Sequence, residues 1–291
     1  MKIDPTRAAH FLHERAALDP VLAVPIEAPR ALSWRPGKEV LLVAAASGAV
    51  TSVEPSFGAR LLFAGPPEPV QLAASGERVA ILTATGAVEV WTLGDREATW
   101  RIESGLTGDS GLRFWSGGVA VIGDASGGRR VRVYSGPKLV QDVRGVPDGV
   151  ALGTSLAGEL QLARSIEAGL VVVPFGAPLP AGTATGHQLR FTPGGHVLGV
   201  AIGGATLWTG ASPHNVRLLD TSCAALCADG KSVALGTRGG IVALSDMAAS
   251  PAARAHPPRV NAHETSVRAM SFSTRGRWLA TVAENCRLWS Y

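Results

Sequence analysis

Short apolar runs recur along the chain, and each follows a cluster of turn residues that contains a glycine. The clearest copies read SWRPGKEVLLVA, LAASGERVAILT, FTPGGHVLGVAI, LCADGKSVALG and FSTRGRWLATVA. In each copy an apolar or aromatic residue precedes the turn, and an apolar run follows it. Glycine frees the backbone for a tight turn, and flanking runs of this kind are typical of antiparallel strands. The pattern therefore predicts a succession of short β-hairpins.

These first turns are evenly spaced. Their glycines are Gly37, Gly76, Gly117, Gly158, Gly194, Gly230 and Gly276, separated by 39, 41, 41, 36, 36 and 46 residues. A second turn follows each first turn after nine to eleven residues and leads into another apolar run, such as VTSV, VEVW or IVAL. A repeat of about 40 residues with four strands is the period of a propeller blade. We predict an all-β domain over residues 19–291, a seven-bladed β-propeller of four-stranded blades.

The two ends of the sequence complement each other. The last repeat stops at its third strand, Trp289-Ser290-Tyr291, and residues 20–28 (PVLAVPIEA) form an extended segment ahead of the first repeat. An open ring would leave unpaired strand edges, which invite aggregation. We therefore expect this N-terminal segment to complete the last blade as its fourth strand.

A short helical extension is predicted over residues 1–18. Asp4 and Pro5 suit the cap and the first position of a helix, and Phe11 and Leu12 would lie along one side of it. The apolar side either packs on the ring or docks a partner.

The last repeat, AHETSVRAMSFSTRGRWLATVAENCRLWSY, carries a distinctive motif. It runs from Ala262-His263 through Phe272-Ser273 and Leu279-Ala280-Thr281 to a closing Leu288-Trp289. In this it resembles a WD40 repeat. The resemblance implies that His263, Thr281 and Trp289 form a hydrogen-bonded chain between strands, with Glu284 where the family usually has Asp. The other repeats follow the WD40 rhythm without its histidine and aspartate.

Residues 225–232 (ALCADGKS) match the looser phosphate-loop pattern A-x4-G-K-S. A phosphate-binding loop leads into the N-terminus of a helix, because the helix end holds the phosphate. The segment after Lys231 reads SVALGTRGGIVAL, two β-like runs separated by a turn. We therefore interpret this stretch as another hairpin turn and not as a nucleotide site.

Composition and charge fit this picture. Glycine and proline contribute 35 and 19 residues, and only 17% of the chain is charged, which suits many strands and tight turns. The net charge of +4 is small, and the densest basic run, Arg129, Arg130 and Arg132, is short. Nucleic-acid binders concentrate basic residues on one face, so a nucleic-acid partner is not expected.

The cysteines bear on the compartment. Cys223, Cys227 and Cys286 are too few and odd in number for a disulfide framework, and Cys223 and Cys227 lack a second ligand pair for zinc. The sequence shows neither an apolar leader nor 18 consecutive apolar residues. We expect a cytoplasmic protein without membrane contact.

The predicted channel offers no catalytic constellation. The inner-strand segments ALSW, VQLA, LRFW, ALGT, LRFT, AALC and VRAMSF are nearly devoid of carboxylates, which argues against a channel metal. Neither G-x-S-x-G nor His-Glu-x-x-His occurs. We expect no metal, no cofactor, no catalytic residue and no small-molecule substrate. A propeller enzyme or small-ligand binder that uses the central channel stays as the alternative.

Partner contacts are predicted on the turns. The turns before the inner strands share one face, commonly the binding face of the family, and they are short and rich in Pro and Gly, which lowers the entropic cost of binding. A second candidate is the connection from Asp246 to His263, the longest irregular stretch. An ordinary solvated turn is the alternative for each residue. The candidates are Arg30, Glu68, Asp109, Asp148 and His187 on the turns, and Arg254, His256 and Arg259 on the connection.

The resemblance implies a non-catalytic protein–protein interaction scaffold, a subunit or adaptor of a multi-protein assembly. Fold alone does not give function, so this expectation rests on the resemblance. Two tryptophans, Trp115 and Trp278, fall at turns of the opposite face, where packing between blades and partner contact are both open.

Overall fold

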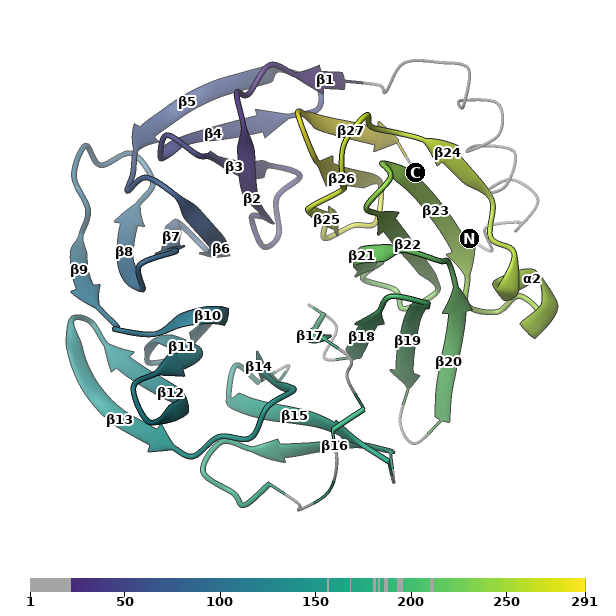
Figure 1. Cartoon of the computed structure of the whole chain (residues 1–291). Coiled ribbons are helices and arrows are strands. Elements are labelled where there is room, and N and C mark those ends of the chain that lie inside the picture. Colours follow the sequence, from purple (N-terminus) through teal and green to yellow (C-terminus); the bar gives the residue numbers. More distant parts are fainter. Residues whose placement is uncertain are drawn as a thin grey trace.

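The computed structural model describes residues 22–290 except 156, 168, 180, 181, 183, 186, 187, 193–195, 210 and 211. Its strands form seven antiparallel sheets arranged in a ring around a central axis (Figure 1). The predicted fold class is confirmed: the protein is a seven-bladed β-propeller. The predicted helical extension, residues 1–18, lies outside the described residues.

The first three blades follow the chain without interruption. Blade one contains β2 (Pro29–Trp34), β3 (Leu41–Ala45), β4 (Ala49–Glu54) and β5 (Gly58–Ala64). Blade two contains β6 (Pro69–Ser75), β7 (Arg78–Thr83), β8 (Ala87–Thr92) and β9 (Trp100–Glu103). Blade three contains β10 (Thr107–Trp115), β11 (Gly118–Ala125), β12 (Gly128–Ser135) and β13 (Lys138–Arg144). In each blade the first strand lies innermost and the fourth outermost (Figure 1).

The next three blades keep this order. Blade four contains β14 (Val150–Thr154), β15 (Leu160–Ile166) and β16 (Gly169–Pro174), so three strands are seen among its described residues. Blade five contains β17 (Gln188–Phe191), β18 (Val197–Ala201), β19 (Gly204–Thr209) and β20 (Ser212–Arg217). Blade six contains β21 (Thr221–Leu226), β22 (Ser232–Thr237), β23 (Ile241–Asp246) and β24 (Arg259–Asn261).

The seventh blade joins the two ends of the chain, as predicted. It contains β25 (Ala269–Phe272), β26 (Trp278–Val282) and β27 (Cys286–Ser290), and its fourth strand is β1 (Leu22–Val24). β1 pairs with β27 antiparallel, with Leu22 opposite Leu288 and Val24 opposite Cys286. Val24 and Leu288 are almost fully buried. Burial and pairing together fix this N-terminal segment in the ring.

The core lies between neighbouring blades, where the apolar face of one sheet packs on the next. Leu41 and Val43 of β3 share a buried cluster with Ala280 and Val282 of β26, so blades one and seven pack against each other where the ring closes. Between blades one and two the rings of Phe63 and Trp91 stack with centroids 4.2 Å apart. Dense packing of this kind makes the ring one rigid body.

The turn at Gly230 is a hairpin turn, as the sequence predicts. Gly230 has a φ of 72°, in the left-handed region that glycine enters without strain. The Lys231 amide donates to Asp229 Oδ1, and the next residues form strand β22 rather than a helix. The phosphate-loop interpretation is therefore excluded by the backbone.

The prediction of an irregular connection between Asp246 and His263 is wrong. It contains helix α2 (Pro251–Ala255), with Ser250 Oγ capping it by accepting from the Ala253 amide, and the outer strand β24. Both lie at the outer edge of the ring (Figure 1). β24 has only three residues, which is too short for alternation of polar and apolar residues to indicate a strand in sequence.

Trp115 and Trp278 lie at the ends of strands β10 and β26 and are only partly exposed. Trp115 packs against the cluster between blades three and four, and Trp278 against the cluster between blades one and seven. Both tryptophans therefore pack between blades, which is one of the two alternatives for them. Across the described part of the chain, helices long and apolar enough for a bilayer are absent.

Candidate functional site

The structure brings together the four residues that the WD40 resemblance singles out. The Trp289 Nε1–H donates to Thr281 Oγ1 at 3.0 Å, and Thr281 Oγ1 lies 2.8 Å from His263 Nε2. His263 Nδ1 lies 3.1 Å from Glu284 Oε1. Because the indole only donates, the Thr281 hydroxyl is free to donate to Nε2, and the Nδ1–H then donates to the carboxylate. The four side chains therefore tie the entry loop of blade seven to its second and third strands.

The charges of this cluster follow from its surroundings. Burial lowers the pKa of His263, against the opposing effect of the Glu284 carboxylate. For Glu284, partial burial acts to raise the pKa, but hydrogen bonds from its own amide, from Thr265 and from His263 outweigh burial and bring the pKa to about 2. A neutral imidazole beside an ionised carboxylate is a structural arrangement, since neither group is poised to exchange a proton near neutral pH.

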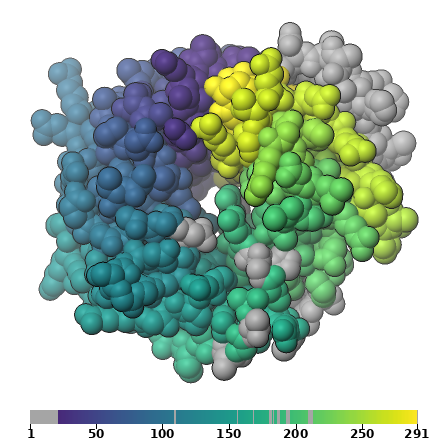
Figure 2. Space-filling model, viewed as in Figure 1, coloured from purple at the N-terminus to yellow at the C-terminus, as the bar shows by residue number. Residues whose placement is uncertain are grey.

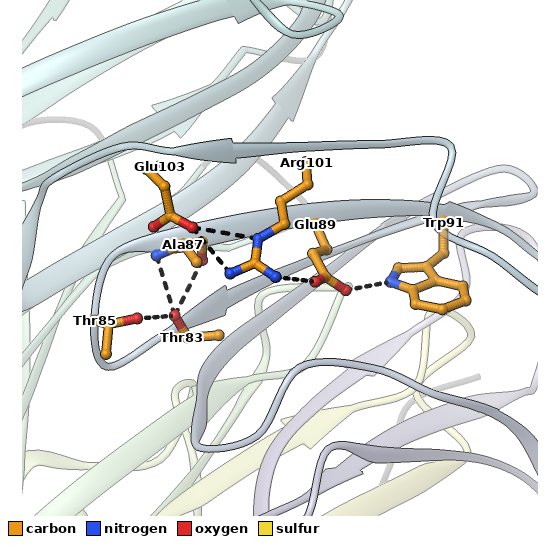
Figure 3. Close-up of polar contacts among 7 residues, drawn as sticks. All are labelled: Thr83, Thr85, Ala87, Glu89, Trp91, Arg101 and Glu103. Atoms are coloured by element: carbon orange, nitrogen blue, oxygen red, sulfur yellow. Dashed lines mark hydrogen bonds and ion pairs between the residues drawn. The ribbon is translucent and has the colours of Figure 1, made fainter.

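Blade two satisfies its tryptophan in a different way. By strand register, Ile81 of blade two occupies the position that corresponds to Thr281 of blade seven, so a hydroxyl is missing there. Trp91 Nε1–H donates instead to Glu89 Oε2 at 3.1 Å. Arg101 on the outer strand pairs with Glu89 at 3.4 Å and with Glu103 at 2.9 Å (Figure 3). The side chain of Glu89 is only 9% exposed, so this bridge holds a buried charge in place.

Thr83 closes the hairpin of the same blade. Its hydroxyl donates to the Ala87 carbonyl, accepts from the Ala87 amide at 3.1 Å, and lies 2.9 Å from Thr85 Oγ1 (Figure 3). The two networks in blade two are thus ties between strands, with no group left free for chemistry.

The predicted face holds Arg30, Glu68 and Asp148, all exposed. Arg30 Nη2 and Glu68 Oε2, from blades one and two, lie 3.9 Å apart, while Asp148 precedes the inner strand of blade four. The backbone of Asp109 belongs to β10, and its side chain is not described; His187 lies outside the described residues. The structure therefore joins only Arg30 and Glu68 into one small patch.

A backbone feature shared by three blades gives Glu68 a second role. Ala28, Glu68 and Asp220 have φ values of 45°, 53° and 63°, which is left-handed backbone directly before an inner strand. Their carbonyls accept hydrogen bonds from the amides of Ala46, Ala84 and Arg238 in the second turns of their blades. Left-handed backbone costs about 1–2 kcal/mol for a non-glycine residue. These three hydrogen bonds offset that cost and fix the shape of the loops on this face.

A cleft of about 650 Å³ opens between blades five and six at the outer rim. The loop after β20 forms one wall and the segment after α2 the other, with Arg217, Leu219, Ile241, His256 and Arg259 among the lining residues. Leu219 is 83% exposed, and nearby Ile202 is 66% exposed. Two of the predicted contacts, His256 and Arg259, therefore meet at one apolar site with basic edges.

Arg254 does not belong to this cleft. Its Nη1 donates to the carbonyls of Met247 and Ala249, at 3.0 and 2.5 Å, and so fixes the loop that leads into α2. Arg254 is partly buried, and its contact with a partner stays a prediction.

The central channel carries residues that the sequence reading passed over. Figure 2 shows the opening at the middle of the ring. Arg113 on β10 and Arg190 on β17 line both cavities of the channel, and Arg30 and Arg268 line one of them. In the sequence, these arginines are isolated cations within the apolar inner-strand segments LRFW, LRFT and VRAMSF.

Metal ligands do not gather in the described residues: no group of three His, Cys, Asp or Glu side chains is placed to hold an ion there. Cys223, Cys227 and Cys286 are free and buried, and burial raises the pKa of each thiol, to about 11, 11 and 12. These thiols behave as small apolar core residues.

No protein-family model and no curated protein matches this sequence. Solved structures do resemble it. The β-propeller domain of Cps50 (Swd1) from Myceliophteria thermophila aligns with a TM-score of 0.71 at 14% identity, over 94% of this chain and 99% of that one. Raptor from Chaetomium thermophilum aligns with a TM-score of 0.71 at 14% identity, over 94% of this chain and 28% of that one. A chain of the Mitotic Checkpoint Complex gives 0.69 at 15% identity, over 94% and 92%. At these identities the comparison establishes the shared fold.

Proposed function

We propose that this chain is a non-catalytic interaction subunit that binds a segment of another protein in the rim cleft between blades five and six. The observation that carries the proposal is an exposed apolar site with basic edges on a rigid ring. Leu219 is 83% exposed at this cleft, and Arg217 and Arg259 stand beside it. Apolar side chains that gather on the surface beside a cleft, rather than in the core, are typical of a docking site.

The chemistry of the cleft indicates the kind of segment it accepts. Asp220 is the only acidic residue among the described lining residues, and it pairs with Arg238 at 3.9 Å. Arg217 and Arg259 therefore leave the edges of the cleft positive. A partner segment with an apolar side chain flanked by carboxylates complements both features.

The similar structures support an interaction role in one respect: one of them is a chain of the Mitotic Checkpoint Complex, an assembly by its printed name. The free, buried cysteines support the proposal that the protein works in the reducing cytoplasm.

The proposal is tested by affinity purification from the native host with a Leu219→Ser/Arg259→Glu variant, read out by quantitative mass spectrometry. A matched control is Leu61→Ser/Arg60→Glu, because Leu61 is 62% exposed and Arg60 lies beside it on the outer strand of blade one. We expect the cleft variant to lose about tenfold or more of the specific partner while the control keeps it. Equal recovery with both variants, or no specific partner for the unaltered chain, would contradict the proposal.

A further inference from the structure

Two arginines from different blades reach the middle of the central channel. Arg113 on β10 and Arg190 on β17 line both a cavity of about 220 Å³ and a cavity of about 480 Å³. The larger cavity is otherwise lined by small residues such as Ser33 and Ala73 and by large apolar ones such as Phe191. Arg113 and Arg190 are the charged residues among its described lining.

Within the described part of the chain, neither of these two charges has a carboxylate partner. Arg113 Nη1 donates to the Leu112 carbonyl at 2.9 Å, which satisfies one of the five N–H donors of the guanidinium. Neither cavity has an Asp or Glu among its described lining residues. Burial and then the nearby charge of Arg190 lower the pKa of Arg113 to about 10. The channel thus holds like charges that repel each other in the absence of an anion.

Further cations continue from this pair to one mouth of the channel. Arg268 before β25 and Arg30 on β2 line the smaller cavity together with Arg113 and Arg190. Arg30 is partly balanced by Glu68 at 3.9 Å, whereas the structure shows no acidic partner for Arg268 among the described residues. The charged residues among the described lining of the smaller cavity, Arg129 included, are all arginines.

We propose that the central channel is a binding site for a small, multiply charged phosphate compound held between Arg113 and Arg190. Guanidinium groups bind phosphate oxygens through two parallel hydrogen bonds, and two of them facing one cavity favour a ligand with at least two charges. The cavity of about 220 Å³ is smaller than the pockets of drug-sized ligands, which fits a compact anion. This site is separate from the rim cleft and does not depend on the function proposed for it.

The test is isothermal titration calorimetry of the full chain with inorganic diphosphate, with orthophosphate and citrate as comparison ligands. We expect one diphosphate per chain, tighter than either comparison ligand, with an affinity that falls as salt is added. Citrate separates phosphate recognition from general attraction of a polyanion. Equal or tighter binding of citrate, or no heat with diphosphate, overturns the proposal.

Variants locate the site. Arg113→Gln and Arg190→Gln should each weaken diphosphate binding by about tenfold or more, and the double variant should abolish it. The control Arg60→Gln removes an exposed arginine from the outer strand of blade one and should leave binding unchanged. Unchanged affinity in the double variant overturns the proposal.

A second readout does not need the ligand. Because the two charges repel, the Arg190→Gln variant without ligand should melt at or above the temperature of the unaltered chain. Diphosphate should raise the melting temperature of the unaltered chain more than that of the variant. If Arg113→Gln fails to fold, Arg190→Gln, whose parent side chain is exposed, carries the test alone. A ligand-induced shift as large in Arg190→Gln as in the unaltered chain contradicts the assignment.

Discussion

Thr281 joins two hydrogen bonds whose other partners come from different parts of blade seven. Its hydroxyl contacts Trp289 Nε1 at 3.0 Å and His263 Nε2 at 2.8 Å, and all three residues are buried. The sequence could identify these residues, because the motif of the last repeat resembles that of a WD40 repeat. The sequence does not predict the Glu89–Trp91 hydrogen bond of blade two. There the indole N–H is bound by a carboxylate on the same strand, which is not part of the motif.

Replacing Thr281 with valine should lower the free energy of unfolding by about 2 kcal/mol. Valine keeps the shape but leaves the indole N–H and the imidazole nitrogen unpaired in a dry site. Denaturant unfolding followed by fluorescence measures this. The control is Thr51→Val, because the side chain of Thr51 is also buried and makes no hydrogen bond that the described structure shows. A loss no larger than in the control would show that the cluster contributes little.

The same cluster predicts a pH dependence. The pKa of Glu284 is about 2 in the folded chain against an ordinary value of 4.5, so the unfolded state binds more protons between these values. Stability due to this group is complete above about pH 4.5 and is lost as the pH falls toward 2. The lowered pKa of His263 acts in the same direction, below its ordinary value of 6.5.

Glu284→Gln should therefore remove part of the acid sensitivity, because glutamine does not titrate. Urea unfolding at a series of pH values measures the slope of stability against pH. The variant should be less stable than the unaltered chain near neutral pH, and the difference should shrink below about pH 4.5. Glu97→Gln, which removes an exposed carboxylate away from the cluster, is the control. Parallel curves for Glu284→Gln and the unaltered chain would contradict the account.

At the scale of the element, the second-turn glycines have a common physical cause. The carbonyls of Gly48, Gly86 and Gly240 accept from the amides of Gly65, Ser104 and Ala262 in the following loop, at 2.9, 2.9 and 3.0 Å. A Cβ added at these glycines would lie 2.3, 2.5 and 2.0 Å from a backbone oxygen. The repeated glycine is thus required by the close approach of the next blade's loop as well as by its left-handed φ.

This predicts unequal effects at two turns of one blade. Gly86→Ala should cost about 3 kcal/mol or more in unfolding free energy, because the methyl group would displace backbone. Gly76→Ala should cost only about 1–2 kcal/mol, because its φ is 59° but nothing lies within 4 Å of the added carbon. Thermal unfolding of the two variants side by side is the measurement. Equal losses would contradict the argument from close approach.

The sequence predicts the inner three strands of the blades better than the outer ones. Inner strands such as β3, LLVAA, are buried throughout and stand out as apolar runs between glycine turns. Outer strands such as β13, KLVQDVR, are mostly exposed and keep no apolar pattern, and β24 is a three-residue strand after a short helix. The pattern of apolar and polar residues reflects burial, so it does not indicate a strand that is exposed on both faces.

The rim cleft could not be predicted for the same reason. It depends on how the loop after β20 lies against the segment after α2, two stretches about 40 residues apart whose contact only the ring produces. The length of the connection alone indicates His256 and Arg259 as partner contacts, whereas nothing in the sequence indicates Leu219. Likewise, Arg113 and Arg190 become one feature only when the inner strands converge on the axis.

At the scale of the whole molecule, everything depends on closure of the ring. The rim cleft and the channel are formed by blades that hold fixed positions only if the last blade is locked to the first. That lock is the pairing of β1 with β27 together with the buried cluster shared by blades one and seven. Open ends would free the edges of both blades and let the channel widen.

A disulfide across the closure tests this most directly. Ala23 and Arg287 face each other in the antiparallel pair, and directly opposed residues lie close enough for a disulfide. In the Ala23→Cys/Arg287→Cys variant we expect an intramolecular disulfide to form under native conditions, as seen by mass spectrometry, and to raise the melting temperature. The pair Ala23→Cys/Arg60→Cys, on separate blades, should stay reduced. If the first variant stays reduced in the folded chain, or oxidises no more than the second, the ring is not closed by its N-terminal strand.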